Sequence, residues 1–273
     1  MLRRSAIAVA AVLAALAAAP PAGASLVALG DSFSSGEGAP PFEPGHCHRS
    51  PHAWPLVLAA RLDAPGTSRA CSGAVVADVV QDQIPRVAPG ADVLTLTIGG
   101  NDLGFAEVLR RCVLADCVRH YARAGRDAID ARVRALRARL PALYRRVRSA
   151  APGAGLVVLG YPRLFPRRPG RFTCAALGAI SRAEALYLNA KTAAADRAIR
   201  AAARDAGALY VETLDAFDGG EVRCAPRRRY VNDLTFLRGG VISPYSFHPT
   251  AAGHARLAAL ALDGLAANVR DRR

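Results

Sequence analysis

Short apolar runs alternate with longer amphipathic segments along most of the chain. The runs are rich in Val, Leu and Ile, which is typical of parallel strands buried on both faces. The amphipathic segments carry apolar residues three and four positions apart, which is typical of helices with one buried face. The expected strands are 26–29, 92–98, 155–160 and 208–211, with a short extended piece before Cys71. The expected helices are 53–62, 75–84, 181–206 and 249–269, with one helix or a pair over 118–150 and a candidate kink at Pro141.

Strands that alternate with helices indicate parallel βαβ units. The sequence has no internal repeat and no linker, and 273 residues suit one large domain. We therefore expect residues 25–273 to form a single three-layer α/β/α domain. Two segments lack a regular pattern. We interpret 112–117 as a loop pinched between cysteines, and 212–247 as a long loop held by a disulfide.

The first 24 residues are typical of a secretory signal peptide. Arg3 and Arg4 give a positive start, an apolar stretch covers 6–19, and 22–24 is an Ala-Gly-Ala cleavage pattern. The alternative is an uncleaved membrane anchor, but the apolar stretch is too short to cross a bilayer comfortably. We expect a secreted, extracellular protein whose mature chain begins near Ser25.

Six cysteines in an exported chain indicate disulfides. Many pairings are possible, and the simplest joins cysteines that are neighbours in the sequence. The alternative is a zinc site that uses His46 and His48 beside Cys47, but the chain lacks the paired-cysteine spacing of such sites, so no metal is expected. The expected disulfides are Cys47–Cys71, Cys112–Cys117 and Cys174–Cys224.

The chain is strongly basic, with a formal net charge of +14, and Lys191 is its only lysine. Such a charge favours contact with anionic surfaces, including phospholipid and nucleic acid. The arginines are scattered and are not interleaved with aromatic residues, and no nucleic-acid motif is present. We interpret the charge as a solvated basic surface that permits peripheral contact with an anionic lipid surface, and we expect no nucleic-acid partner.

Three small polar segments lie next to expected strands or helices. A parallel sheet gathers such segments at one edge, so we expect the three to lie close together. Residues 30–32 are Gly-Asp-Ser, 99–102 are Gly-Gly-Asn-Asp, and 246–249 are Ser-Phe-His-Pro. Nucleophilic catalysis needs a hydroxyl, a base that takes its proton, and donors for an oxyanion. The matching groups are Ser32, His248 and the side-chain amide of Asn101.

With these motifs in this order, the sequence resembles the SGNH, or GDSL, hydrolase family from Ser25 to about residue 268. The resemblance implies a flavodoxin-like fold with about five parallel strands and hydrolysis of carboxylic esters. It implies that Ser32 is the nucleophile and His248 its base. It also implies an oxyanion hole made by the backbone N–H groups of Ser32 and Gly73 and the amide of Asn101. The six cysteines and the stretch 49–55 look most like secreted actinobacterial lipases and esterases.

The chain departs from the family pattern at Tyr245, where many members carry an aspartate three residues before the histidine. No acidic residue lies between Asp233 and His248. A histidine base needs its Nδ1–H held by an acceptor so that Nε2 faces the serine. We expect the backbone carbonyl of Ser246 or Tyr245 to hold it, as in dyad members of the family. A carboxylate from elsewhere, such as that of Asp233, is the alternative.

Other residues near these motifs are interpreted as structural. We expect Asp31, Asp102 and Glu37 to brace loops through hydrogen bonds. We expect Trp54 to lie in the core and His254 to be a structural residue of the last helix.

The sequence therefore predicts a secreted serine esterase or lipase that needs no cofactor and is a monomer. Its substrate would be a lipid or another acyl ester. One alternative is a non-catalytic surface- or lipid-binding protein on the same fold. A second is an esterase of acetylated carbohydrates.

Overall fold

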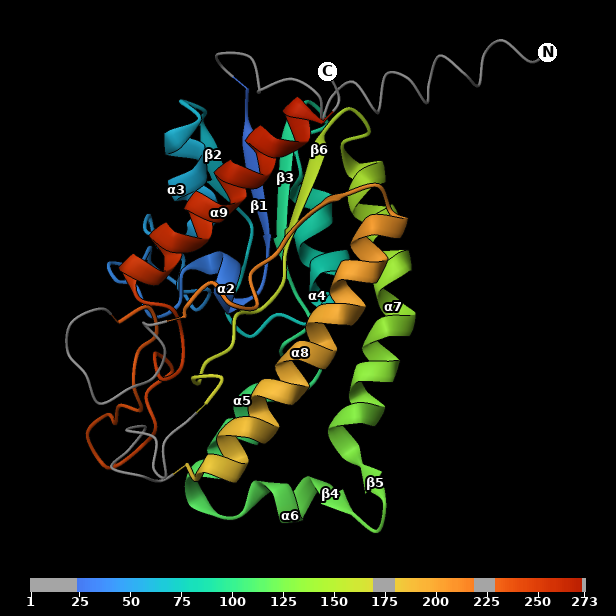
Figure 1. The fold of residues 1–273 in the computed structure, drawn as a ribbon. Helices are drawn as coiled ribbons and strands as arrows, with labels where there is room; N and C mark the ends of the chain where they lie inside the picture. The colour runs from blue at the N-terminus through green and yellow to red at the C-terminus, as the bar shows by residue number, and fades with distance from the viewer. Residues whose placement is uncertain (1–23, 169–179, 219–228, 272–273) are drawn as a thin grey trace.

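The structure of the protein, a computed structural model, describes residues 24–168, 180–218 and 229–271. Within these residues the main sheet has five strands, all parallel, in the order β2-β1-β3-β6-β7 (Figure 1). This is the flavodoxin-like order, in which ligands bind beyond the carboxyl ends of the strands. The strands are β1 (Leu26–Gly30), β2 (Gly66–Ser68), β3 (Val93–Thr97), β6 (Gly155–Leu159) and β7 (Leu209–Val211).

Helices cover both faces of the sheet, because alternate strand residues point to opposite sides and both sides are apolar. Leu26 and Ala28 of β1 pack in one core with α3 and α9, whereas Val27 and Leu29 pack in a second core with α4, α7 and part of α8. Figure 1 shows α3 and α9 on one side of the strands and α7 and α8 on the other. The long helices are α3 (Trp54–Arg61), α7 (Ala128–Ala150), α8 (Arg182–Asp205) and α9 (Ala251–Arg270). The α/β/α fold expected from the sequence is confirmed.

Shorter elements complete the fold, and some correct the sequence-based expectations. The segment 112–117 is not a simple loop, because Cys112 lies in α5, Cys117 begins α6, and a disulfide joins the two helices. The helix expected over 75–84 is divided into α4, a π-helical turn and a 3₁₀ turn. The short elements are α2 (Ser32–Ser35), α4 (Val76–Asp78), η1 (Val79–Gln83), η2 (Ile84–Arg86), α5 (Phe105–Leu114), α6 (Cys117–Tyr121), β4 (Ala122–Arg123) and β5 (Arg126–Asp127).

The two prolines expected near helices behave differently from each other. Helix α7 continues through Pro141, so the segment 118–150 is divided at the β4–β5 hairpin rather than at the proline. Pro249 lies just outside α9, because Thr250 is the N-cap and its hydroxyl accepts a hydrogen bond from the Gly253 N–H at 3.2 Å.

Two residues interpreted as structural lie in the core. Trp54 is fully buried, and its backbone N–H donates to His254 Nδ1 at 3.3 Å. Burial lowers the pKa of His254 to about 3, so this histidine is neutral at ordinary pH.

The expected signal peptide and the expected Cys174–Cys224 disulfide fall outside the described residues, apart from Ala24. In the described part of the chain, no helix is both long enough and apolar enough to span a bilayer.

Candidate active site

The serine of the first polar turn lies at the carboxyl end of β1. Gly30 has a φ of +125°, and a Cβ there would lie 2.2 Å from the Thr97 carbonyl oxygen, so only glycine fits. Asp31 then caps α2, with Oδ1 accepting from the Phe33 N–H at 3.0 Å. Ser32 is therefore the first residue of α2, and only 7% of its surface is exposed.

His248 approaches Ser32 from the other end of the chain. Its Nε2 lies 2.8 Å from Ser32 Oγ, which is hydrogen-bond distance. Asn232 holds the histidine segment: its side-chain amide donates to the carbonyls of His248 at 3.1 Å and Gly38 at 2.9 Å. Phe247, with a φ of 64°, turns the chain just before the histidine. The fold thus brings together two residues that are 216 positions apart.

The second ring nitrogen of His248, Nδ1, is buried and is not hydrogen-bonded to a carboxylate of the described residues. Among the described residues, none forms a hydrogen bond of standard geometry with Nδ1. Burial lowers the pKa of His248, while the carboxylate of Glu37 and the backbone carbonyls of Pro244 and Ser246 act in the opposite direction. Of the two expected acceptors, the Ser246 carbonyl is therefore near the ring, whereas the Tyr245 carbonyl accepts from the backbone N–H of His248 at 3.1 Å.

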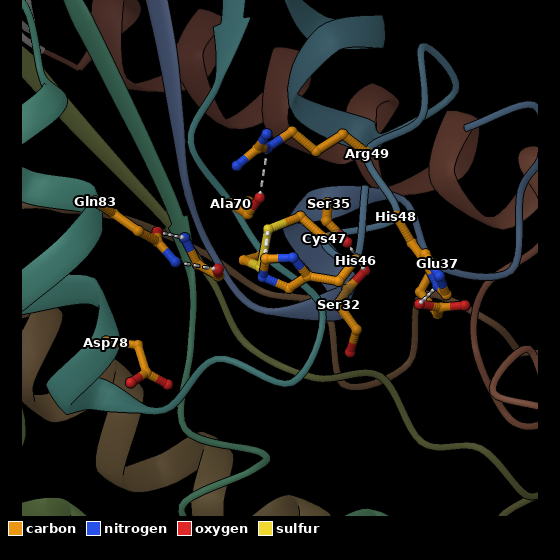
Figure 2. Close-up of a disulfide and its surroundings, with 12 residues drawn as sticks. Ser32, Ser35, Glu37, His46, Cys47, His48, Arg49, Ala70, Asp78 and Gln83 are labelled. Carbon is orange, nitrogen blue, oxygen red and sulfur yellow. Dashed lines mark hydrogen bonds and ion pairs between the residues drawn. A yellow bond between two sulfur atoms is a disulfide. The ribbon is translucent and has the colours of Figure 1, made fainter. Parts of the chain in front are cut away.

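The side chain of Asp233, the alternative partner for the histidine, accepts a hydrogen bond from the residue that follows it. Its Oδ1 accepts from the Leu234 N–H at 2.8 Å. The carboxylate of Glu37 acts on His248 and raises its pKa. Glu37 is completely buried, and its Oε2 lies 2.7 Å from Nδ1 of His48 (Figure 2).

Gly73 and Asn101, the two expected oxyanion donors besides Ser32, line the same cavity as Ser32 and His248. Gly73 has a φ of +84°, which side chains rarely allow. The Asn101 amide donates to the Ala74 carbonyl at 3.0 Å. Because an amide carries two N–H groups, this bond orients the side chain and leaves a second donor for a ligand.

A disulfide fixes the turn that carries Gly73. Cys47 and Cys71 are bonded, and the Arg49 side chain donates to the Ala70 carbonyl at 2.8 Å beside them (Figure 2). These contacts tie the turn at Gly73 to the loop that precedes α3. The disulfide therefore supports the part of the cavity wall that Gly73 forms.

Two further side chains hold the ends of β1 and β3. Gln83 accepts from the Gly30 N–H at 2.8 Å and donates to the Gly30 carbonyl at 2.9 Å (Figure 2). Asp102 accepts from the Val76 N–H at 3.0 Å, and burial raises its pKa. The sequence predicted the bracing role of Asp102 but not that of Gln83, which lies on the π-helical turn η1.

Tyr161 links the serine turn to the asparagine turn. Its hydroxyl donates to Asp31 Oδ2 and accepts from the Gly100 N–H at 2.8 Å. Burial raises the pKa of Asp31 to about 7 and raises that of Tyr161 as well. Sequence analysis missed Tyr161, although a polar residue at the carboxyl end of a parallel strand was a usable signal.

We expect Tyr161→Phe to lower kcat about tenfold with little change in KM, because the lost hydroxyl positions both turns while the ring still lines the cavity. The matched control is Tyr210→Phe, which removes another hydroxyl bonded to a buried aspartate, Asp196, away from the cavity lining. Steady-state kinetics of both variants on one soluble ester test this. Equal kcat values for the two variants would show that the bridge has no positioning role.

The cavity beside Ser32 has a volume of about 350 Å³ and a largely apolar wall. It opens where α5 and the segment before His248 meet the carboxyl ends of the strands. Arg110 is the only arginine among the described residues that line the cavity. The apolar lining residues include Phe33, Leu103, Phe105, Leu109, Leu164, Ile242 and Phe247.

Groups of potential metal ligands in the described residues all contain disulfide-bonded cysteines. One is His46, Cys47 and Cys71, and the other is Cys112, Cys117 and Glu184. A disulfide sulfur is not a thiolate, which is the form of cysteine that binds metals. These groups therefore offer no thiolate site while the disulfides are intact.

The sequence profile of the GDSL-like Lipase/Acylhydrolase family matches residues 28–256, which include Ser32, Gly73, Asn101 and His248. The chain belongs to this family. The hydrolase is 35% identical to Lipase 2 of Streptomyces coelicolor, with 88% of this chain and 85% of that protein aligned. It is 36% identical to a lipase of Streptomyces rimosus, with 84% and 82% aligned.

Solved structures of similar proteins agree with this assignment. The phospholipase A1 of Streptomyces albidoflavus NA297 is 33% identical, with a TM-score of 0.71 over 89% of this chain and 99% of that one. The extracellular lipase of Streptomyces rimosus is 32% identical, with a TM-score of 0.70 over 88% and 99%. The GDSL hydrolase described here is therefore a carboxylic ester hydrolase of the lipase/esterase type.

Proposed function

We propose that this hydrolase cleaves esters through an acyl-enzyme on Ser32, with His248 as general base. The observation that carries the proposal is the 2.8 Å contact between Ser32 Oγ and His248 Nε2 at the wall of an apolar cavity. A serine hydroxyl is a weak nucleophile unless an adjacent base takes its proton. Burial favours the neutral form of His248, which is the form that can accept this proton.

In the first half-reaction, Ser32 Oγ forms a bond to the ester carbonyl carbon as its proton moves to His248 Nε2. The developing oxyanion accepts hydrogen bonds from the backbone N–H groups of Ser32 and Gly73 and from the Asn101 amide. The carbon–oxygen bond to the alcohol then breaks, and the alcohol leaves with the proton from His248. In the second half-reaction, water attacks the acyl group, gives a proton to His248, and releases the acid as that proton returns to Ser32.

The base in this proposal belongs to a dyad, with a backbone carbonyl in place of an aspartate. The support is the buried Nδ1, which faces the carbonyl region of Pro244 and Ser246 and is not bonded to a carboxylate of the described residues. A carbonyl can fix the ring orientation, but it stabilises the imidazolium less than a carboxylate does.

The substrates in this proposal are esters with an apolar acyl chain, including glycerolipids. The apolar wall beside Ser32 suits a hydrocarbon chain better than a sugar, which needs polar partners. The similar proteins include lipases and a phospholipase A1.

The protein acts outside the cell as a single domain from Ser25 onward. The leader-like pattern at the amino terminus, the two disulfides among the described residues and an extracellular relative support this placement.

Hydrolysis of p-nitrophenyl esters of graded chain length tests the proposal. We expect kcat/KM to rise from acetate to medium-length chains, as added methylenes enter the apolar cavity. A maximum at acetate, with activity on acetylated sugars, would support the carbohydrate-esterase alternative. No turnover of any ester by folded protein would support the non-catalytic binding alternative.

The pH profile gives a second prediction. A general base works only when neutral, and the pKa of His248 is lowered from 6.5, so kcat/KM should rise with pH through an apparent pKa below 6.5. The Glu37 carboxylate raises the pKa of His248, so Glu37→Gln should move this rise to lower pH. The control is Glu43→Gln, which removes an exposed carboxylate from the loop before α3. A shift to higher pH for Glu37→Gln, or equal profiles for both variants, would contradict this account.

A further inference from the structure

The segment between Asn232 and His248 contains a short hairpin that is apolar on both faces. Phe236 and Ile242 form an antiparallel bridge, and the Leu237 N–H donates to the Val241 carbonyl at 2.7 Å. Directly paired residues share a face of a hairpin, and consecutive residues alternate. Phe236 and Ile242 therefore occupy one face, and Leu237 and Val241 occupy the other.

Three of these side chains are exposed, which is unusual for a hairpin of this kind. The exposed fractions are 55% for Phe236, 51% for Leu237 and 61% for Val241. A hairpin that lies on a domain normally buries one apolar face and presents a polar one. Here both faces carry apolar side chains in contact with solvent, so the hairpin projects from the surface. Exposed apolar groups that cluster in this way mark a surface that binds another apolar phase or partner.

The hairpin is continuous with the catalytic cavity. Ile242 lines the cavity from the hairpin side. At the base of the hairpin, the Thr235 N–H donates to Ser246 Oγ at 3.0 Å, two positions before His248. The exposed apolar side chains at the tip are therefore continuous, through Ile242, with the apolar wall beside Ser32.

Helix α5, which also lines the cavity, carries a further exposed apolar side chain. Ala106 and Arg110 line the cavity, and Leu114 follows on the same helical face because residues four apart are neighbours on a helix. Leu114 is 68% exposed. Figure 1 shows α5 and the segment that contains the hairpin at the same end of the molecule, beyond the carboxyl ends of the strands. Exposed apolar side chains therefore occur on both the hairpin and the helix that contribute to the cavity wall.

Positive charge accompanies these apolar side chains. Arg238 lies at the exposed tip of the hairpin, beside Gly239 and Gly240, and Arg110 lies at the cavity. The acidic residue Glu107 also lies on α5, but its carboxylate has other partners. Its Oε2 lies 3.8 Å from an Arg132 guanidinium nitrogen, and its Oε1 accepts from the Tyr121 hydroxyl at 3.3 Å. The whole chain has a formal net charge of +14. Two copies of so basic a surface repel each other, whereas an anionic lipid surface attracts it.

We infer that the hairpin 235–243 and Leu114 form a docking surface for the interface of an anionic phospholipid bilayer. The apolar tip enters the acyl region while Arg238 contacts phosphate groups. A lipid acyl chain then reaches Ser32 along an apolar path that begins at the hairpin. This inference rests on the proposed ester hydrolysis at Ser32 and adds the surface on which that hydrolysis takes place.

The test measures binding and hydrolysis separately. The full chain with Ser32→Ala is mixed with vesicles of phosphatidylcholine alone or with an equal part of phosphatidylglycerol, and bound protein is measured by sedimentation. The triple change Phe236→Ser, Leu237→Ser and Val241→Ser should weaken binding to the anionic vesicles at least about tenfold, because three apolar side chains lose their burial in lipid. Arg238→Gln should weaken binding about fivefold and reduce its sensitivity to salt. Leu186→Ser, at a 42% exposed leucine of α8, is the matched control and should bind unchanged.

The same hairpin changes in the protein with Ser32 intact should leave kcat/KM for a soluble short-chain ester unchanged, because none of the three residues lines the cavity. Hydrolysis of vesicle lipid should fall in parallel with binding.

Unchanged vesicle binding by the triple variant would overturn the inference, as would equal binding to neutral and anionic vesicles. So would dimerisation of the unaltered protein that the triple variant abolishes, because a second copy would then be the occupant. Failure of the proposed function would appear separately, as absence of hydrolysis of the soluble ester.

Discussion

Ser32→Ala is expected to lower kcat for ester hydrolysis about a million-fold, and His248→Ala should have a similar effect. The two side chains act as one unit through the 2.8 Å contact between Oγ and Nε2, so removing either one leaves the other without a role. The double variant should therefore be no slower than either single variant. Steady-state kinetics on a soluble ester, with single-turnover measurements for the weakest variants, test this.

The fold should survive the loss of the Ser32 hydroxyl. The structural hydrogen bonds at this residue are made by its carbonyl, which accepts from the backbone N–H groups of Gly36 and Glu37, both at 3.1 Å. Unchanged circular dichroism and melting temperature are expected. The control is Ser149→Ala, which removes an exposed hydroxyl bonded to the Arg145 carbonyl near the end of α7 and should keep full activity. Activity retained by folded Ser32→Ala would exclude the serine mechanism.

Asn101→Ala is expected to lower kcat by roughly two to three orders of magnitude, the usual cost of losing one oxyanion donor. KM should change little, because the donor acts mainly on the charge that develops in the transition state. The hydrogen bond from the Asn101 amide to Ala74 holds the donor in place before substrate binds. Separate values of kcat and KM test this.

Asn101→Asp separates loss of the donor from loss of side-chain volume. It keeps the shape of the residue but carries no N–H group, and its ionised carboxylate places a negative charge near the oxyanion. We therefore expect it to be at least as slow as Asn101→Ala. A rise in KM at constant kcat in both variants would mean that Asn101 binds substrate rather than the transition state.

Much of the fold was readable from the sequence because its signals are local. The strand beginning at Leu26 and the helix capped by Ser181 appear in the residue pattern, and both form close to the expected bounds. The positions of Ser32 and His248 followed from the rule that parallel strands deliver their polar turns to one edge. Helix α5 was missed because its buried residues occupy only a few positions between Gly104 and a cysteine-linked turn.

The contacts that refine the site were not readable, because they join distant parts of the chain. Tyr161 and Asp31 are 130 positions apart, and Gln83 and Gly30 are 53 apart. The carboxylate of Glu37 raises the pKa of His248, and nothing in the sequence indicated that this residue lies near the histidine. Such partners depend on how helices and loops pack, which no short pattern records.

The central claim, an acyl-enzyme on Ser32, is tested most directly by covalent trapping. The protein is treated with a p-nitrophenyl alkylphosphonate, which transfers its phosphonyl group to an activated serine, and is then analysed by intact and peptide mass spectrometry. We predict one adduct per chain, located on Ser32, and none in the Ser32→Ala variant. An adduct on any other residue, or an active protein that stays unlabelled, would contradict the account.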